Sequence, residues 1–391
     1  PKRTDLDKML TINMGEEPGA LKKKLGNDLY KVRTLVVSGK INGNDLATLR
    51  DMVGCTGYKT PQLARLDLSA AQIVKGGIYL DDIELNKDNH LPNRIFENAV
   101  SLRSITVPST LRSIGIWAFQ DTYSLREVNL NEGLEEIGTW AFASRGVESS
   151  LEKINIPSTV RLFQGATFTS CYLLKDFTIH PDNPYYTFDG IAVYTKDYGQ
   201  IVHIFPSYAG VLSLPDVCHT VQWGSLFSGD IKGFVGKNVI EIGGRAFADL
   251  YYADYLAFGS KLERVGYGPF ERARLKRLYF GCHDIPDGEY VDYVDGVYSE
   301  YWDAYKKVTL YVPRDAVDKF QKHRVWGMAK EVLPIEDTEF AYLADTELDA
   351  VGEVKTSSTA MPHSIYSLTG VKLNRPIKGL NIVDGKKVMV K

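Results

Sequence analysis

Residues 102–142 contain one pattern twice: LRSITVP at 102–108 and LRSIGIWAF at 111–119 are followed by LREVNL at 125–130 and LEEIGTWAF at 134–142. The two closing phenylalanines, Phe119 and Phe142, lie one repeat apart. A repeat of about two dozen residues is too short to bury its apolar side chains alone, so successive repeats must stack on one another. The pattern therefore predicts a solenoid of stacked coils, in which each coil contacts only its neighbours.

The phenylalanine recurs along most of the chain, and six intervals separate its seven positions. All intervals but one fall between 20 and 26 residues, which with Leu-x-x-Leu-x-Leu spacing is typical of leucine-rich repeats. The expected anchors are Phe96, Phe119, Phe142, Phe168, Phe227, Phe247 and Phe270. We therefore predict a strand-rich α/β solenoid, a right-handed leucine-rich-repeat stack.

Other segments interrupt or flank the repeats. The long interval before Phe227 contains an insertion at 180–210, predicted to be a β-hairpin that projects from its coil and turns at 196–199. A second insertion spans 282–307. The predicted domains are a cap with atypical repeats at 1–90, the solenoid at 91–335, a linker at 336–360 and a small β-module at 361–391 that turns at 384–385.

Helices are expected mainly in the N-terminal cap and at the end of the stack. A short helix is predicted at 20–25, and a longer one is predicted to begin at a cap formed by Asn44 or Asp45. After the last repeat, a helix capped by Asp315 is expected to carry apolar residues toward Trp326 and close the stack.

Bulk composition excludes several classes of protein. The chain has 391 residues, 44% hydrophobic and 24% charged, with a net charge of -3. That balance gives no general attraction to nucleic acid or to an anionic membrane, and no apolar run is long enough for a transmembrane segment.

The chain begins at Pro1, which predicts that a preceding segment was removed; a secretory signal is one explanation, and a chain cut there for another reason is the alternative.

No residue pattern points to catalysis, a metal or a cofactor. The four cysteines, Cys55, Cys171, Cys218 and Cys282, are too far apart for a disulfide scaffold or a structural zinc site, so we predict buried free thiols. Cys218 and Cys282 each precede a histidine, but adjacent strand residues point to opposite faces. We therefore assign no catalytic residue, no metal ligand and no cofactor.

The repeats resemble the BspA-like class of leucine-rich repeats, found in surface and secreted proteins of Bacteroidetes-type gut and oral bacteria. The resemblance rests on the Leu-x-x-Ile-x-Ile-Pro and Ile-Gly-x-x-Ala-Phe blocks and covers residues 95–335. It implies a secreted or cell-surface adhesion protein without catalytic activity. The implied partners are host or bacterial surface proteins or glycans. The segment 365–391 resembles C-terminal modules of exported proteins in the same bacteria.

The exposed strand positions are the predicted ligand-binding surface. The residue after each leading Leu forms one column of the stacked strands: Arg33, Ala64, Arg103, Arg126, Glu152, Lys175, Lys232, Asp254, Lys276 and Val308. Six of these ten are basic, which suits an acidic protein segment or a sulfated or uronic glycan. The competing interpretation is that these charges only keep an exposed sheet soluble. The candidate binding residues are Arg103, Arg126, Lys175, Lys232, Tyr255, Lys276, Arg277 and Tyr279.

Two alternatives to a binding protein remain open. The segment 284–305 places several Asp and Glu residues among tyrosines, and paired carboxylates beside aromatic rings are what a glycan-processing enzyme needs. A solvated loop packed by its own aromatic residues has the same composition. The other alternative is a structural spacer that presents the C-terminal module.

Overall fold

The computed structural model describes residues 8–57, 61–145, 149–163, 165–288 and 305–344, together with the strands of a C-terminal module. The chain divides into two compact units, residues 1–346 and 347–391. The larger unit contains the repeats and is described first.

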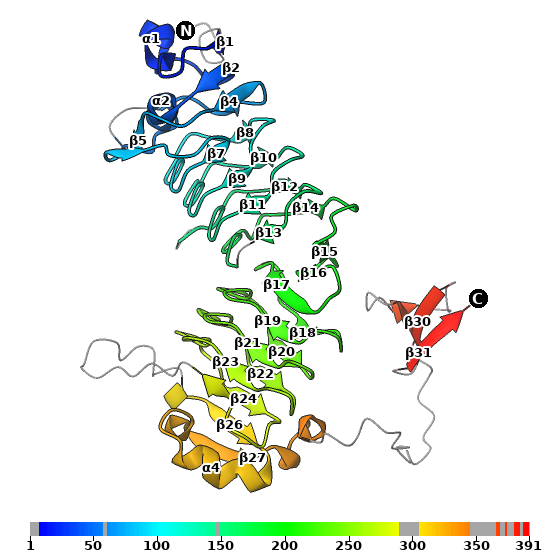
Figure 1. The fold of residues 1–391 in the computed structure, drawn as a ribbon. Helices are drawn as coiled ribbons and strands as arrows, with labels where there is room; N and C mark the ends of the chain where they lie inside the picture. The colour runs from blue at the N-terminus through cyan, green and yellow to red at the C-terminus, as the bar shows by residue number, and fades with distance from the viewer. Residues whose placement is uncertain are drawn as a thin grey trace, which may run out of the picture. The chain divides into compact units, whose positions relative to one another are not determined.

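In the first half of this unit, each regular coil contributes a strand to each of two parallel sheets (Figure 1). One sheet contains β1 (Met9–Asn13), β2 (Thr34–Ile41), β3 (Arg65–Asp67), β8 (Ser104–Thr106), β10 (Glu127–Asn129), β12 (Lys153–Ile156) and β14 (Asp176–Ile179), with β4 (Ala71–Ile73) beside β2. The other contains β7 (His90–Leu91), β9 (Ser113–Ile114), β11 (Glu136–Ile137) and β13 (Leu162–Phe163). Pairing is in register, with Ile105 opposite Val128.

The second half repeats this plan with a new pair of sheets. One contains β18 (Val211–Ser213), β20 (Gly233–Gly236), β22 (Tyr255–Phe258), β24 (Arg277–Phe280), β26 (Thr309–Val312) and β27 (Glu331–Pro334). The other contains β15 (Tyr186–Phe188), β16 (Ala192–Thr195), β17 (Gln200–Ile204), β19 (Thr220–Val221), β21 (Glu241–Ile242), β23 (Arg264–Val265) and β25 (Asp287–Gly288). The predicted strand-rich leucine-rich-repeat solenoid with parallel sheets is confirmed, whereas its right-handed winding and its cap stay predictions.

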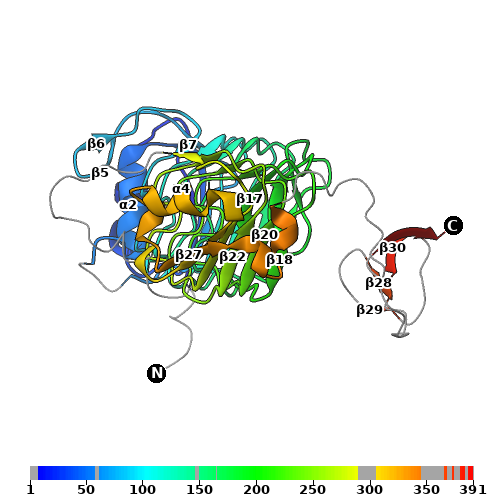
Figure 2. The ribbon, with the colours of Figure 1, turned by 90° about the horizontal axis from the view of Figure 1, so that it is seen from below.

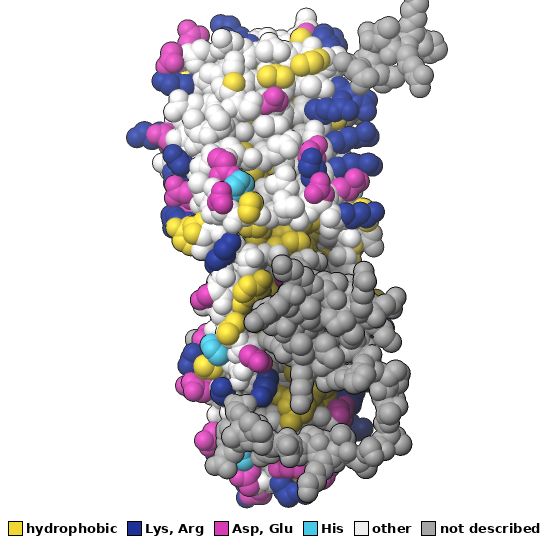
Figure 3. Space-filling model, turned by 90° about the vertical axis from the view of Figure 1, so that its right-hand side faces the viewer, with side chains coloured by type: hydrophobic (Ala, Val, Ile, Leu, Met, Phe, Trp, Pro, Cys, Tyr) yellow, Lys and Arg dark blue, Asp and Glu magenta, His cyan; other side chains and the backbone are white. Residues whose placement is uncertain are grey.

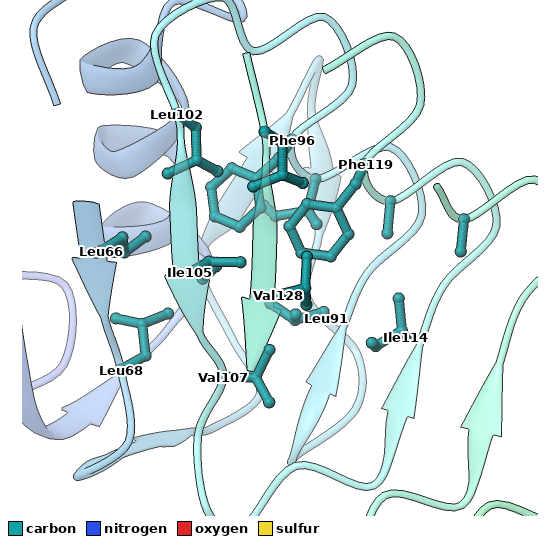
Figure 4. Packing of buried hydrophobic residues seen from close by; sticks show 14 of the residues in the cluster. Leu66, Leu68, Leu91, Phe96, Leu102, Ile105, Val107, Ile114, Phe119 and Val128 are labelled. Carbon is teal, nitrogen blue, oxygen red and sulfur yellow. The ribbon is translucent and has the colours of Figure 1, made fainter. Parts of the chain in front are cut away.

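The phenylalanine anchors stack inside the coils because the turns that carry them are hydrogen-bonded to one another. Phe96 N–H donates to Ala118 O, and Phe119 N–H donates to Ala141 O, both at 2.7 Å. The ring centroids of Phe96 and Phe119 lie 5.5 Å apart, and those of Phe119 and Phe142 lie 5.2 Å apart. Figure 4 shows Phe96 and Phe119 above the inward-facing Leu and Ile side chains of the strands.

One predicted anchor is wrong. At the coil that follows the long interval, Leu226 occupies the anchor position, is 1% exposed, and donates its N–H to Ala246 O at 2.8 Å. Phe227 points away from the core, and its ring lies 6.2 Å from that of Trp140. Because Leu226 and Phe227 are adjacent and both apolar, the sequence pattern did not decide which of the two is the core anchor.

The insertion at 180–210 forms the predicted antiparallel hairpin, but it does not project. Strand β17 continues into the parallel sheet by pairing with β19, and the hairpin lies between two hydrophobic cores. Val193 and Val202 belong to the first core, whereas Tyr194 and Ile201 belong to the second. Because successive strand residues face opposite sides, both faces of this hairpin are buried.

The N-terminal region contains α1 (Leu21–Leu25), the 3₁₀ turn η2 (Gly26–Asp28), α2 (Gly43–Val53), and an antiparallel pair, β5 (Ile78–Leu80) with β6 (Ile83–Glu84). The cap of α2 is Asn42 rather than the predicted Asn44 or Asp45. Asn42 accepts from Asn44 N–H, and Asp45 accepts from Asn42 N–H, both at 3.0 Å. This reciprocal pair satisfies the first turn of the helix.

After the last repeat come η3 (Arg314–Ala316), α4 (Val317–Lys322), η4 (Trp326–Met328), η5 (Ile335–Asp337) and η6 (Ala341–Leu343). In the view from below, α4 lies across the ends of the strand rows (Figure 2). Phe320 and Trp326 are buried in the second core. Asp315 does not cap the helix as predicted; its carboxylate lies 2.9 Å from His283 Nδ1.

The second unit is a small antiparallel sheet in the order β29 (Lys372–Leu373), β28 (Ile365–Ser367), β30 (Gly379–Val383) and β31 (Lys386–Val390). Val383 lies opposite Lys386 across residues 384–385.

We predict that His203 makes the hairpin between the two cores sensitive to acid. Burial lowers the pKa of His203 to about 3, and neither ring nitrogen has a hydrogen-bond partner in the described part of the chain. Below about pH 6.5 the unfolded chain binds a proton that the folded chain does not. Folding stability should therefore fall by roughly 1 kcal/mol for each pH unit down to the folded pKa.

Thermal melts of the wild type and His203→Leu at neutral and acidic pH test this prediction. The variant should lose less stability on acidification, whereas His219→Leu, which changes an exposed histidine, should behave like the wild type. Equal acid sensitivity of His203→Leu and the wild type would contradict the prediction.

Candidate functional site

The predicted basic column exists in the first half of the solenoid. Each member is the residue immediately before a strand, and its N–H donates to the carbonyl of the preceding member. Arg103 donates to Ala64, Arg126 to Arg103, Glu152 to Arg126 and Lys175 to Glu152, over 2.7–3.1 Å. Arg103, Arg126 and Lys175 are exposed, and a vertical row of basic side chains marks one edge of the upper coils (Figure 3).

The column is interrupted between Lys175 and Lys232. These residues precede strands of different sheets, β14 and β20, because the hairpin β16–β17 separates the two halves. In the second half, Asp254 N–H donates to Lys232 O at 2.8 Å, and Lys330 N–H donates to Val308 O at 2.9 Å. The eight candidate residues therefore form two separate groups rather than one continuous surface.

Acidic neighbours partly neutralise both groups. Arg126 lies 3.5 Å from Glu152, and Lys276 lies 2.5 Å from Asp254. The hydrogen bond from Lys276 is the main reason why the pKa of Asp254 lies below its usual value. Such exposed pairs add little stability, but they reduce the positive potential of the basic column. A reduced potential is expected if these charges only keep the exposed sheet soluble.

In one part of the second group only some basic side chains have such a partner: Arg272 pairs with Asp249, Lys276 with Asp254 and Arg277 with Glu339. A hollow of about 860 Å³, which we call the basic hollow, lies beside the N-terminal ends of β24 and β26. No Asp or Glu lines it among the described residues. Its basic lining residues are Arg272, Arg274, Lys276, Arg277, Lys307 and Lys330. The sequence analysis did not predict Arg272, Arg274, Lys307 and Lys330 as binding residues; for Lys330, the missed signal was the short strand β27 that follows it.

Arg277 is held in a fixed orientation at this hollow. Its guanidinium carbon lies 5.5 Å from the Tyr255 ring centroid and 5.9 Å from that of Tyr279. Its N–H groups donate to the Tyr279 hydroxyl at 3.0 Å and to Glu339 at 3.1 Å. A guanidinium ordered in this way loses little entropy when it binds an anion.

Tyr279 itself is not a surface residue, so its assignment as a ligand contact is corrected. Its side chain is 1% exposed, and burial raises its pKa to about 12. The cover consists of residues 335–344, which the sequence had placed mostly in a linker. Ile335, Phe340 and Leu343 pack with Tyr279 and Ala257 in a separate hydrophobic cluster.

Gly281 shows how closely this segment approaches the sheet. A Cβ added at Gly281 would lie 2.0 Å from the carbonyl oxygen of Leu343, so a larger residue cannot be accommodated without movement. The part of the strand face formed by β22, β24 and β26 is therefore partly covered by the chain itself.

The described residues do not bring the remaining sequence candidates together in one site. Most of the acidic insertion, residues 289–304, lies outside the described residues, and Asp284 is ion-paired with Lys319. All four cysteines are free thiols, and burial raises the pKa of Cys171 to about 12. No group of three or more His, Cys, Asp and Glu side chains within the described ranges could hold a metal ion. The described helices include none long and apolar enough to cross a membrane.

Comparison with known proteins identifies the repeats. A protein built from such coils is a leucine-rich-repeat protein, and residues 89–194 match the BspA type leucine rich repeat region in six copies. This part of the chain therefore consists of BspA-type leucine-rich repeats. No curated protein matches it.

Three solved structures are similar to this chain. The pneumococcal vaccine antigen PcpA has 15% identity and a TM-score of 0.46, covering 86% of this chain and 91% of that one. A leucine-rich repeat protein from Eubacterium ventriosum has 16% identity and a TM-score of 0.49, covering 76% and 78%. A leucine rich cell surface protein from Faecalibacterium prausnitzii has 15% identity and a TM-score of 0.46, covering 87% and 82%.

We predict that Phe340 holds residues 335–344 against the sheet. Phe340→Ala removes a ring that contacts Tyr255 and Tyr279, with centroids 5.0 and 4.6 Å away. The loss, about 3 kcal/mol for a buried Phe, should release this segment while the repeats stay folded. Hydrogen exchange should therefore accelerate in 335–344 and not in β8–β12.

Tyr342→Ala is the matched control, because Tyr342 is 45% exposed and its loss should leave exchange nearly unchanged. Uniform acceleration across the solenoid in Phe340→Ala would show that the segment is not a separate cover.

Proposed function

We propose that the chain is a non-catalytic secreted or cell-surface binding protein whose basic hollow receives an acidic ligand. The observation that carries the proposal is the lining: six basic side chains surround one hollow, and three of them, Arg274, Lys307 and Lys330, form no ion pair with a described carboxylate. Proteins of this repeat class are generally non-catalytic binding proteins. Surface location is proposed from the class resemblance alone.

The hollow suits carboxylate or sulfate groups better than the first column does. Arg277 is oriented by two tyrosine rings and can offer remaining N–H groups to two anionic oxygens. Lys307 and Lys330 add flexible positive charge at the rim. Arg103, Arg126 and Lys175 instead project singly from the sheet edge, so they are better placed to attract a ligand than to hold it.

The test is binding to two acidic probes, heparin and poly-glutamate, with uncharged dextran as the reference. We expect the hollow to bind at least one acidic probe, with affinity that falls as salt rises. Lys307→Ala combined with Lys330→Ala should weaken binding about thirtyfold, since each lost contact costs roughly 1 kcal/mol and every 1.4 kcal/mol is tenfold.

The double variant Lys22→Ala, Lys261→Ala is the matched control. It removes the same net charge from two exposed positions outside the hollow, so it should bind like the wild type. Charge reversal at Arg103, Arg126 and Lys175 should slow association more than it weakens final affinity. Equal losses in both double variants would show that net charge, rather than the hollow, drives binding.

A further inference from the structure

A second concave region lies on the turns of the coils and is built around tryptophan; it shares Arg272 with the basic hollow. Two hollows of about 640 and 610 Å³ meet there and share Trp117 and Trp140 as a common wall. Each hollow falls within the size range of small-ligand pockets. We call the pair the turn groove.

The tryptophans occupy a backbone position that does not favour them. The residue two before each core anchor has a left-handed conformation in every coil, with φ of 58° at Trp117 and 53° at Trp140. Glycine adopts this conformation without strain, and Gly224 and Gly268 occupy the same position in other coils. Arg94, Ala166 and Arg245 also occupy this position, so the fold does not require a large aromatic side chain here.

The tryptophans form part of an aromatic cluster that crosses from one half of the solenoid to the other. The rings of Trp117 and Trp140 are stacked with centroids 6.1 Å apart. Trp140 also meets Trp223 at 5.5 Å and Phe227 at 6.2 Å, both edge-on. Trp223 is 37% exposed. Phe227 joins this cluster because Leu226, not Phe227, enters the core.

The charged residues around the second hollow are paired with one another. Arg145 lies 2.9 Å from Asp121 and 3.0 Å from Glu97. Arg272 lies 2.5 Å from Asp249, and Arg245 lies 3.0 Å from Glu271. All four acidic residues are buried: Asp121, Asp249 and Glu271 are at most 5% exposed, and Glu97 is 6% exposed. The turn groove therefore offers fixed donors and acceptors but little net charge, in contrast to the basic hollow.

One further polar group lines the second hollow. Gln120 is 2% exposed, and its Oε1 has no hydrogen-bond partner in the part of the chain that the structure describes. A buried acceptor without a partner is costly, so it fits a site where a ligand supplies the donor.

We propose that the turn groove binds a neutral oligosaccharide. Hydroxyl groups both donate and accept hydrogen bonds, so they match paired guanidinium and carboxylate groups without breaking the ion pairs. The apolar parts of sugar rings match the indole and phenyl surfaces. An acidic or basic ligand would have to compete with an existing ion pair, and a purely apolar peptide would leave Gln120 Oε1 without a donor.

The experiment measures quenching of tryptophan fluorescence in the full chain by four neutral probes: cellohexaose, maltohexaose, xylohexaose and mannohexaose. We expect saturable binding of at least one probe that changes less than about twofold between low and high salt, because no net charge is involved. This salt response separates the turn groove from the basic hollow, so either site can fail without the other.

Three variants distinguish a binding role from a structural one. Trp117→Gly and Trp140→Gly should each weaken binding about tenfold. Their melting temperatures should fall little, because glycine relieves the left-handed backbone. Gln120→Met should also weaken binding while raising the melting temperature by a few degrees, roughly what removing an unsatisfied acceptor yields. Tyr252→Ala, an exposed aromatic residue outside both hollows, should change neither.

The outcomes are decisive in both directions. Saturable binding that is lost in the glycine variants and weakened in Gln120→Met supports the proposal. Absence of binding to all four probes, binding kept in the glycine variants, or saturation by apolar peptides alone overturns it. If a glycine variant fails to fold, unchanged binding in Gln120→Met also overturns it.

Discussion

The backbone hydrogen bonds between successive coils are the interaction on which the rest of the structure depends. Each coil is hydrogen-bonded to the next in register through both its strands and its turns: Phe119 N–H donates to Ala141 O of the following coil, and Arg126 N–H donates to Arg103 O of the preceding one. Because parallel strands lie about 4.8 Å apart, every position in the repeat becomes a column of side chains. The same geometry builds the phenylalanine core, the basic residues before the strands and the strained residues two before each anchor.

The hairpin β16–β17 changes this regularity at one place. Its alternating residues belong to two different cores, so the two halves share a wall and do not merge their interiors. The insertion therefore costs the fold little buried surface, since both faces of the hairpin are covered. The hairpin also ends one sheet at β14, and a new sheet begins after it. Lys175 and Lys232 therefore do not belong to one column.

The periodic features could be predicted from the sequence, and the exceptions could not. The spacing of Leu, Ile and Phe predicted the strands and placed Arg103, Arg126 and Lys175 in one column. Phe227 was wrongly predicted as a core anchor because the neighbouring Leu226 is also apolar and fits the core. The sequence alone does not decide which of the two side chains faces inward. Tyr279 was taken as exposed because the segment that buries it has no period, only scattered apolar residues such as Phe340. The tryptophans stand at a repeat position that Arg, Ala and Gly also occupy, so only the stacking of their rings and the hollows beside them mark them.

In-register stacking has a consequence for ligands that touch more than one region. Adding or deleting a coil would move the regions on either side of it by about 4.8 Å and leave each region intact. Distances along the solenoid can therefore change only in whole steps. A long polymer with repeating groups can contact two regions at once only if the spacing of its groups matches the distance between those regions. Binding at both regions together raises avidity well beyond either contact alone.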